Sequence, residues 1–570
     1  MWRLCYPQGL LNEKQHHVLS PPCSTGLGGH TWKGGTSLAE ELTFARKASG
    51  LVRGLSLYDA FGMGIINTLP LYGIWFMFMS LAIFPKMNLL LAVVITTVTL
   101  GVVSPIVWGV LGASMPRSGG DYLYNTRVIN PVIGMAASMG MVLGEMYWSI
   151  YMATWITQPS LQIIGQYTGW KGLTNFANST SGTFLCSVLL FVAAFCLVSF
   201  GWRVYHVFIR PVLFITLAMT AVVFLPMIFR SPSSFIHIWN SAAAHYHSLN
   251  YHAFIKAVGK ASGSPITGTW NWSDTIGGFT ATFMLVIYNY VAAYVGGEVK
   301  KPGKAVFLAH LWGNAITVGL SLICLAGLYR MVSMKFMVAA AWNQLNGPIA
   351  GYKLPWDTSL LGVTFMGSGM NRVFGVLTAL TWLFGTIAIF AVILVFVQRV
   401  LFAWSMDRMA PKFLSDISTR WATPVKGFAL VAVIICGFSL AYILWLKSAL
   451  TGLVAAGMMT VSVFLVTSIS AILLPYRKRV RMIWEASPYS QWKIGRVPVV
   501  TIAGVIYCGY VLVLLYYAFL SPRTRDITGK NAFIFIGIWV FGILWYLGWR
   551  YGNRKKEINI DVAFKELPPE

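Results

Sequence analysis

The stretch GIINTLPLYG, residues 64–73, places an amide, a hydroxyl and a proline inside an otherwise apolar run. Pro70 cannot donate a backbone hydrogen bond, while Asn67 and Thr68 can compete with a helix for backbone partners. Backbone groups that such a break frees cannot face lipid, so they must face protein or a water-filled cavity. The two half-helix ends would offer a bound molecule partial charges of opposite sign. A proline kink in a packed helix is the alternative interpretation.

A second stretch of this kind, LVIYNYV, covers residues 285–291 and contains Asn289. Polar and helix-breaking groups at corresponding places in two halves of a membrane chain are typical of discontinuous helices around a binding site. We therefore expect the two stretches to meet around one site, with Asn67 and Asn289 as hydrogen-bonding groups.

Glu145, in the segment GEMYW, lies in the middle of a long apolar stretch. An ionised carboxylate there costs about 3 kcal/mol on membrane-insertion scales, so it should be protonated, paired or in contact with water. A carboxyl group whose proton affinity changes with access suits a proton-coupled carrier. The alternative is a neutral Glu that is hydrogen-bonded between helices.

The composition indicates the elements that position these residues. The chain has 570 residues, of which 57% are hydrophobic and 10% charged, values outside the range of soluble domains. Apolar stretches of about 20 residues, enough to cross a hydrocarbon core of about 30 Å, occur twelve times. We therefore predict an all-α integral membrane protein with twelve transmembrane helices. The predicted spans are residues 58–79, 89–114, 132–158, 183–202, 209–229, 276–296, 306–332, 373–403, 426–446, 452–475, 498–520 and 533–551.

The spans divide the chain into four predicted parts. Residues 1–50 form a cytoplasmic N-terminal segment and residues 51–476 a transport core of ten helices. Helices 11 and 12 occupy residues 477–551, and residues 552–570 form a cytoplasmic tail. Each half of the core opens with one of the two interrupted spans, which predicts a five-plus-five inverted repeat with discontinuous helices 1 and 6.

The net charge of +25 reflects topology, because most Lys and Arg residues fall in segments that the even span count places on one side. By the positive-inside rule this side is cytoplasmic, so we predict a multi-pass protein of the cell membrane with both termini in the cytoplasm. The expected partners are the lipid bilayer and a small-molecule substrate, without nucleic acid. The chain is expected to be a monomer or homodimer.

No metal site or cofactor is predicted. The outer-loop histidines lack the Cys or carboxylate partners that complete a metal site. They are His237, His245, His247 and His252. The sequence contains no combination of a nucleophile and a base that would indicate an enzyme.

Three motifs resemble those of one family, the amino acid–polyamine–organocation (APC) permeases. MPRSGGDYLY, residues 115–124, is similar to the family signature Pro-x-x-Gly-Gly-x-Tyr-x-Tyr; GEVKKP at 297–302 and DRMAPKF at 407–413 follow in the family's order. The resemblance implies a LeuT-like fold with the substrate at mid-membrane, between the broken centres of spans 1 and 6. The residues expected to bind it are Asn67, Thr68, Leu69, Pro70, Leu71, Gly73, Tyr288, Asn289 and Tyr290. Their aromatic and amide groups would suit a bulky or apolar substrate.

The same motifs predict a cytoplasmic gate formed by Gly119, Gly120 and Glu298. The two glycines permit backbone angles closed to other residues. Glu298, near a helix C-terminus, needs a basic partner, which inner-loop Lys or Arg residues would supply and which would separate as the gate opens. A solvated surface charge is the alternative.

These observations predict a secondary active transporter that moves an amino acid or related small organic solute across the cell membrane by alternating access. The expected coupling ion is a proton, bound at Glu145. Sodium is the less favoured ion, with Thr378, Thr381 and Thr386 as its oxygen ligands. The alternatives are an exchanger or uniporter for an amine or nucleobase-like solute, a channel, or a membrane-embedded solute sensor.

Overall fold

The computed structural model describes residues 51, 53–155, 160–446, 449–521 and 525–567. The predicted N-terminal segment, residues 1–50, lies outside the described residues and stays a prediction. The described residues belong to one compact unit, bounded by Arg46 and Glu570.

Helices occupy all twelve stretches predicted to span a membrane, in their described parts. Those of the first five stretches are α2 (Leu57–Thr68) and α3 (Pro70–Ser80); α4 (Leu89–Thr96), the π-helix η1 (Thr97–Gly101) and α5 (Val103–Ser114); α7 (Pro131–Trp155); α10 (Thr180–Ser199); and α11 (Trp202–Phe229). Those of the next five are α14 (Trp272–Gly277), α15 (Phe279–Thr282), α16 (Met284–Ile287), η3 (Tyr288–Tyr290) and α17 (Val291–Tyr294); α18 (Pro302–Met331); α21 (Arg372–Met406); α22 (Val425–Ala441) and η5 (Tyr442–Leu446); and α23 (Ala449–Leu473). The last two are α25 (Val499–Phe519) and α26 (Arg525–Lys555).

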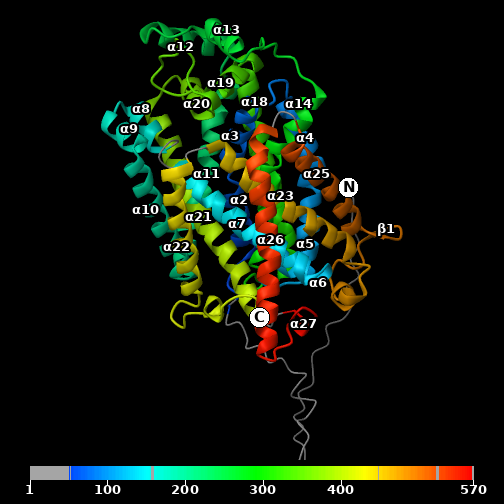
Figure 1. The fold of residues 1–570 in the computed structure, drawn as a ribbon. Helices are drawn as coiled ribbons and strands as arrows, with labels where there is room; N and C mark the ends of the chain where they lie inside the picture. The colour runs from blue at the N-terminus through cyan, green and yellow to red at the C-terminus, as the bar shows by residue number, and fades with distance from the viewer. Residues whose placement is uncertain (1–50, 52, 156–159, 447–448, 522–524, 568–570) are drawn as a thin grey trace, which may run out of the picture. The chain divides into compact units, whose positions relative to one another are not determined.

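Shorter elements connect these helices. They are α6 (Asp121–Val128), α8 (Ile163–Thr168), α9 (Lys171–Asn178), α12 (Pro232–His245), α13 (Tyr251–Ala261), α19 (Met334–Asn346), α20 (Leu360–Gly367), η4 (Lys412–Ser415), η6 (Lys478–Val480), α24 (Arg481–Glu485), the hairpin strands β1 (Lys493–Ile494) and β2 (Val497–Pro498), and α27 (Ile560–Ala563). In Figure 1, α12 and α13 lie at one end of the long helices and α27 at the other. We call these the α13 end and the α27 end.

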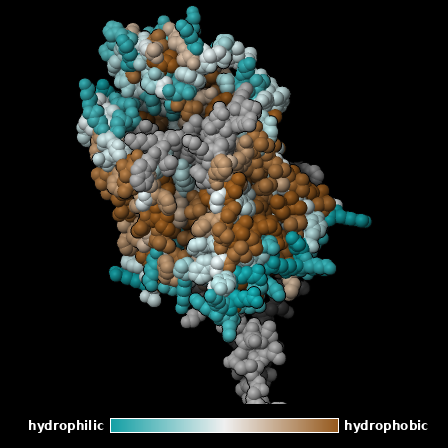
Figure 2. Space-filling model, viewed as in Figure 1, coloured by the Kyte–Doolittle hydropathy of each residue, from teal (hydrophilic) through white to brown (hydrophobic). Residues whose placement is uncertain are grey.

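Long apolar helices make this a multi-pass all-α protein. Among the described residues, nine helices are long and apolar enough to cross a membrane, or up to ten if a pair bent by 80° after α23 counts as one span. The count of twelve spans stays a prediction. Figure 2 shows the hydrophobic residues of one face gathered in a band, with hydrophilic residues at both ends.

Span 1 is broken at Leu69, as the sequence predicts. Leu69 takes a φ of 34° and a ψ of 102°, between the end of α2 and the start of α3. Pro70 lacks the N–H that would continue α2, but it is well suited to the first position of α3, where that N–H would have no partner. Ser56 and Asp59 form a capping box that fixes the start of α2.

Span 6 is irregular rather than fully broken. It consists of short helical segments, and at Tyr288–Tyr290 it tightens into a 3-10 turn. No residue from 284 to 294 has a positive φ, so the interruption is milder than the one at Leu69. A 3-10 turn inside a long helix often marks a hinge or a functional site.

The helices of the predicted outer loops cover the α13 end. An aromatic cluster joins α12, α13 and α19, with the rings of Trp239 and Phe336 5.0 Å apart and those of Tyr251 and Phe336 stacked at 4.9 Å. Helices α25 and α26 pack on the other helices, α25 against α23 and α5, and α26 against α7 and α23. The division at residues 476 and 551 stays a prediction.

Asn289 of η3 is enclosed between two glycine positions. A Cβ atom on Gly64 of α2 would lie 3.2 Å from the Asn289 carbonyl oxygen, and one on Gly313 of α18 would lie 2.5 Å from its side-chain oxygen. Cores packed this closely do not absorb an added methyl group without strain. Helices α2, η3 and α18 therefore pack as one block around this amide.

We predict that Gly313→Ala lowers the melting temperature of the purified protein, because overpacking at such a site costs about 1–3 kcal/mol. The matched control is Gly319→Ala in the same helix, where a Cβ atom meets nothing within 4 Å. That change should leave the melting temperature equal or higher, since Ala is the better helix former. Equal melting temperatures for the two variants would contradict the close packing at Gly313.

Candidate functional site

The interruptions of span 1 and span 6 meet at a hydrogen bond. The Asn67 side-chain amide donates to the Tyr288 carbonyl oxygen at 3.2 Å. Asn67 lies one residue before the end of α2, and Tyr288 opens the 3-10 turn. Because hydrogen-bond geometry within a 3-10 turn is poor, a side-chain donor from α2 stabilises the turn at this point.

A cavity with a volume of about 40 Å³ lies beside this hydrogen bond. The residues that line it are Asn67, Thr68, Tyr72, Gly73, Phe76, Glu145, Trp148, Met284, Tyr288, Ile389 and Ile393. They come from α2, α3, α7, α16, η3 and α21. A mainly apolar and aromatic wall with a few polar groups is the usual composition of a small-molecule site.

The cavity includes part of the predicted binding set. Of that set, Asn67, Thr68, Gly73 and Tyr288 line the cavity. The others, Leu69, Pro70, Leu71, Asn289 and Tyr290, do not. The residues Leu69 to Leu71 form the break itself, and the Leu69 side chain contacts α21 at Gly385.

Asn289 points away from the cavity, toward α18. Its amide donates to the Asn314 side-chain oxygen at 2.8 Å, and the Asn314 amide donates to the Gly101 carbonyl oxygen at 2.8 Å. The sequence predicts Asn289 as a solute-binding group, whereas in the structure its amide ties the 3-10 turn to α18 and η1.

Glu145 of α7 has only 3% of its surface exposed and lines the cavity. The Tyr290 hydroxyl donates to Glu145 Oε1 at 3.1 Å. This bond leaves the remaining carboxylate oxygen available for a proton or for a donor in the cavity. Tyr290 therefore acts behind Glu145 rather than in the cavity wall.

Several lining residues were absent from the sequence prediction. Trp148 follows Glu145 by one helical turn, a spacing that places both on one face of α7. Tyr72 of α3 bonds through its hydroxyl to the Thr386 hydroxyl, and its ring lies 4.0 Å from that of Trp382. Helical spacing from Glu145 points to Trp148, but no sequence pattern distinguishes the lining isoleucines of α21 from ordinary core residues.

The threonines considered as sodium ligands bond within their own helix. The hydroxyls of Thr378, Thr381 and Thr386 donate to the carbonyls four residues earlier at 2.8 to 2.9 Å. No group of three or more His, Cys, Asp or Glu residues that could hold a metal ion occurs in the described part of the chain.

Gly119 and Gly120 sit at the α27 end, against span 6. Their φ angles are 115° and 50°, values that favour glycine. The Gly119 N–H donates to the Tyr294 carbonyl oxygen at 3.0 Å. A Cβ atom on Gly120 would lie 2.5 Å from the Tyr294 ring. The loop before α6 therefore closes directly onto the end of α17.

Glu298 follows α17 and is paired with Arg399 of α21, whose guanidinium contacts both carboxylate oxygens, one of them at 2.9 Å. Both side chains are about 1% exposed. The sequence predicts that the basic partner of Glu298 comes from an inner loop. This location is wrong, because Arg399 lies within the apolar helix α21. Trp202 also donates its indole N–H to Glu298, at 3.1 Å.

The segment before α2 is held at the same place. The Leu55 N–H donates to the Glu298 carbonyl oxygen at 3.0 Å, and the Lys300 N–H donates to the Leu55 carbonyl oxygen at 2.8 Å. Asp59, one turn into α2, accepts two hydrogen bonds from Arg210 of α11 at 2.7 and 2.9 Å. Spans 1, 5, 6 and 8 are therefore cross-linked at the α27 end.

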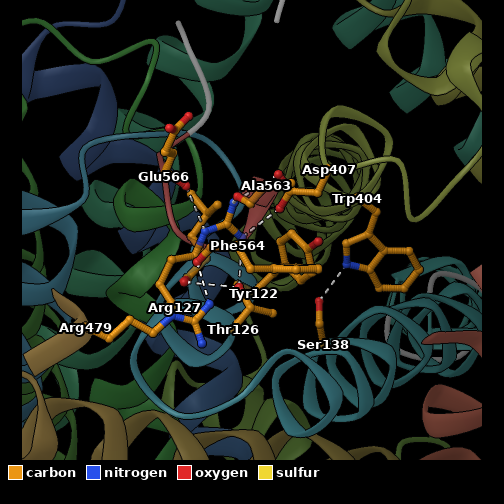
Figure 3. A network of polar contacts seen from close by, with 11 residues as sticks. Tyr122, Thr126, Arg127, Ser138, Trp404, Asp407, Arg479, Ala563, Phe564 and Glu566 are labelled. Carbon is orange, nitrogen blue, oxygen red and sulfur yellow. Dashed lines mark hydrogen bonds and ion pairs between the residues drawn. The ribbon is translucent and has the colours of Figure 1, made fainter. Parts of the chain in front are cut away.

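A buried ion pair lies beneath the C-terminal segment (Figure 3). Arg127 of α6 donates a hydrogen bond to Asp407 Oδ1 at 2.9 Å and forms an ion pair with Oδ2 at 2.7 Å, and both side chains are at most 1% exposed. The same guanidinium donates to the Ala563 carbonyl oxygen at 3.2 Å, and its central carbon lies 5.4 Å from the centre of the Phe564 ring. Arg479 donates to the Phe564 carbonyl oxygen at 2.7 Å. The end of the chain thus fastens α6, α21 and η6 together.

Long apolar helices, a span broken at mid-length and a cavity at the break define this protein as a multi-pass membrane protein with an internal cavity. The family model described as amino acid permease matches residues 55–544. Because the match covers most of the chain, the chain belongs to the amino acid permease family. This family is one of the APC permease families, which the motifs of this chain resemble. A LeuT-like fold is consistent with this family. No curated protein matches this chain.

We predict that Asp407→Asn lowers the melting temperature strongly, because breaking a buried pair leaves the Arg127 charge uncompensated at a cost of about 3–5 kcal/mol. The control is Asp416→Asn, which breaks an exposed pair with Lys426. Exposed pairs contribute about 0–1 kcal/mol, so this variant should melt close to the wild type. A comparable loss in both variants would contradict a special role for the buried pair.

Proposed function

We propose that this protein is a secondary active transporter that moves an amino acid or a related small organic solute by alternating access, driven by a proton gradient. Membership of the amino acid permease family supports a transporter of such solutes rather than an enzyme. The single observation that carries the finer proposal is the cavity that Glu145 lines together with Asn67 and Thr68, at the end of α2, and Tyr72 and Gly73, in the first turn of α3.

The solute site in this proposal is the cavity between α2, α3, α7, η3 and α21. The broken ends of α2 and α3 carry opposite partial charges, which suit the carboxylate and ammonium groups of an amino acid. The rings of Tyr72, Phe76, Trp148 and Tyr288 favour a substrate with a sizeable apolar part. The Asn67 amide is a neutral polar group beside the break.

Glu145 is the proposed proton-coupling group. Within the described residues no ion pair joins it to a basic side chain, and its hydrogen bond comes from a neutral tyrosine. An ionised carboxylate at this depth is costly without a basic partner. Solute and proton would then bind in the same space, which is what coupled transport requires.

The α27 end is the proposed cytoplasmic side, and both termini are proposed to lie in the cytoplasm. Positive charge supports this assignment, since Lys300 and Lys301 lie in the segment bonded to Leu55, and Arg477 and Lys478 adjoin Arg479, which bonds Phe564 beside α27. Gly119, Gly120 and Glu298 then form the cytoplasmic gate, closed in this conformation by the Arg399 pair and the Tyr294 contact. Opening requires these contacts to separate.

We predict that Glu145→Gln abolishes solute uptake driven by an imposed proton gradient in proteoliposomes. The same variant should retain solute counterflow, in which no net proton movement is required. Counterflow of labelled amino acids by the wild type is the control that tests transport itself. Gradient-driven uptake that persists in the variant would exclude Glu145 as the coupling group, whereas absent wild-type counterflow for every solute would exclude the transporter proposal.

We predict that Asn67→Ala weakens solute affinity about five- to thirty-fold, because it removes a cavity donor worth about 1–2 kcal/mol. The affinity is measured on purified protein by the shift in melting temperature with solute concentration. The matched comparison is Asn289→Ala, which removes the same kind of side chain at a position that contacts α18 and does not line the cavity. It should lower the melting temperature of the solute-free protein more than it lowers affinity. An unchanged affinity in Asn67→Ala would move the solute site elsewhere.

A further inference from the structure

Asp121 is a further buried carboxyl group, outside the membrane-spanning helices and outside the cavity. It is the first residue of α6, directly after Gly119 and Gly120, and its surface is fully covered. Oδ1 accepts a hydrogen bond from the Tyr294 hydroxyl at 2.5 Å. Oδ2 has no hydrogen-bond partner among the described residues.

The side chain sits at the contact between α6 and α17, which holds the α27 end closed. The backbone of Gly119 bonds that of Tyr294 at 3.0 Å. The Tyr124 hydroxyl donates to the Ala293 carbonyl oxygen at 3.3 Å. Any movement of α17 away from α6 must break these bonds, and the same movement brings Asp121 into contact with water.

The titratable groups that interact with Asp121 are tyrosines, namely Tyr124 on α6, Tyr290 in η3 and Tyr294 on α17. The neighbouring cations have other partners, since Arg399 pairs with Glu298 and Arg127 with Asp407. Burial raises the pKa of Asp121 to about 7, although the hydrogen bond from the Tyr294 hydroxyl favours the carboxylate.

We propose that Asp121 binds a proton while the α27 end is closed and releases it to water on that side when α17 separates from α6. On opening, the carboxyl O–H bond breaks, the proton passes to water and the carboxylate is solvated; closing reverses the step. This proposal rests on the proposed function for its place in a transport cycle. The proton site itself depends only on the contact between α6 and α17.

Glu145 and Asp121 each accept a hydrogen bond from a tyrosine of span 6. Tyr290 bonds Glu145 beside the cavity, and Tyr294, one turn later, bonds Asp121 at the gate. Their ring centres are 5.4 Å apart. A shift of this part of span 6 therefore changes the surroundings of both carboxyl groups together, which would link solute binding to proton release at the gate.

The pH dependence follows from the sign of the shift. A carboxyl group whose pKa is raised in the closed state favours that state at low pH, and this preference is lost as the pH rises through the raised pKa. With an ordinary carboxyl pKa in the open state, the equilibrium constant for opening rises about ten-fold between pH 6 and pH 8.

The test is amide hydrogen exchange of the full-length chain in lipid nanodiscs at pH 6 and pH 8, corrected for the intrinsic effect of pH on exchange. In the wild type, peptides covering residues 119–124 and 291–299 should lose about ten-fold of their protection at pH 8. Asp121→Asn should remove this difference, while Asp416→Asn, an exposed acid, should keep it. A wild type without the difference, or an Asp121→Asn variant that retains it, overturns the proposal.

Two further variants separate this proposal from the others. Tyr294→Phe removes the hydrogen bond that favours the carboxylate, so the midpoint of the pH effect should move to higher pH; an unmoved midpoint contradicts the assignment to Asp121. Glu145→Gln should keep the pH effect at the gate even though gradient-driven uptake is lost. Because exchange is measured without solute, failure of the transport proposal would show in counterflow and leave this readout intact.

Discussion

A proline at the centre of a membrane helix sets the constraint on which this structure depends. Pro70 has no N–H, so the backbone hydrogen bonds of α2 cannot continue into α3, and the chain turns at Leu69. In a membrane the freed backbone groups need partners or a polar space. The Asn67 amide, bonded to the Tyr288 carbonyl, fixes the break against the 3-10 turn of span 6, and the cavity lies where the two meet.

The closed end follows from a second constraint, the high cost of unpaired charge away from water. The α27 end contains two buried pairs, Glu298 with Arg399 and Arg127 with Asp407. Each joins segments far apart in the chain, so each helps to define one arrangement of the helices. Asp121 is equally buried, but it differs from these pairs because its hydrogen-bond partner is a neutral tyrosine. A neutral partner leaves its charge free to change, which a charged partner would oppose.

The sequence predicts the parts of this structure that follow from local chemistry. Pro70 beside Asn67 indicates the break, the capping residues before it indicate where α2 begins, and long apolar stretches predict the helices. The direction in which a side chain points in an irregular segment depends on residues that are distant in the sequence. Asn289 turns toward α18 because Gly64 and Gly313 leave room for its amide there, and no pattern within residues 285–291 reveals that space. The partner of Glu298 escaped prediction for a similar reason, since Arg399 lies inside an apolar helix that touches Glu298 only after folding.

The most direct test of the account is the structure of this protein with a transported amino acid bound, determined by electron cryo-microscopy in lipid. The account predicts solute density beside the break at Leu69, within contact distance of Asn67, Glu145 and Tyr288. Solute density at another place, or a helix that continues without interruption through Leu69 and Pro70, would contradict it.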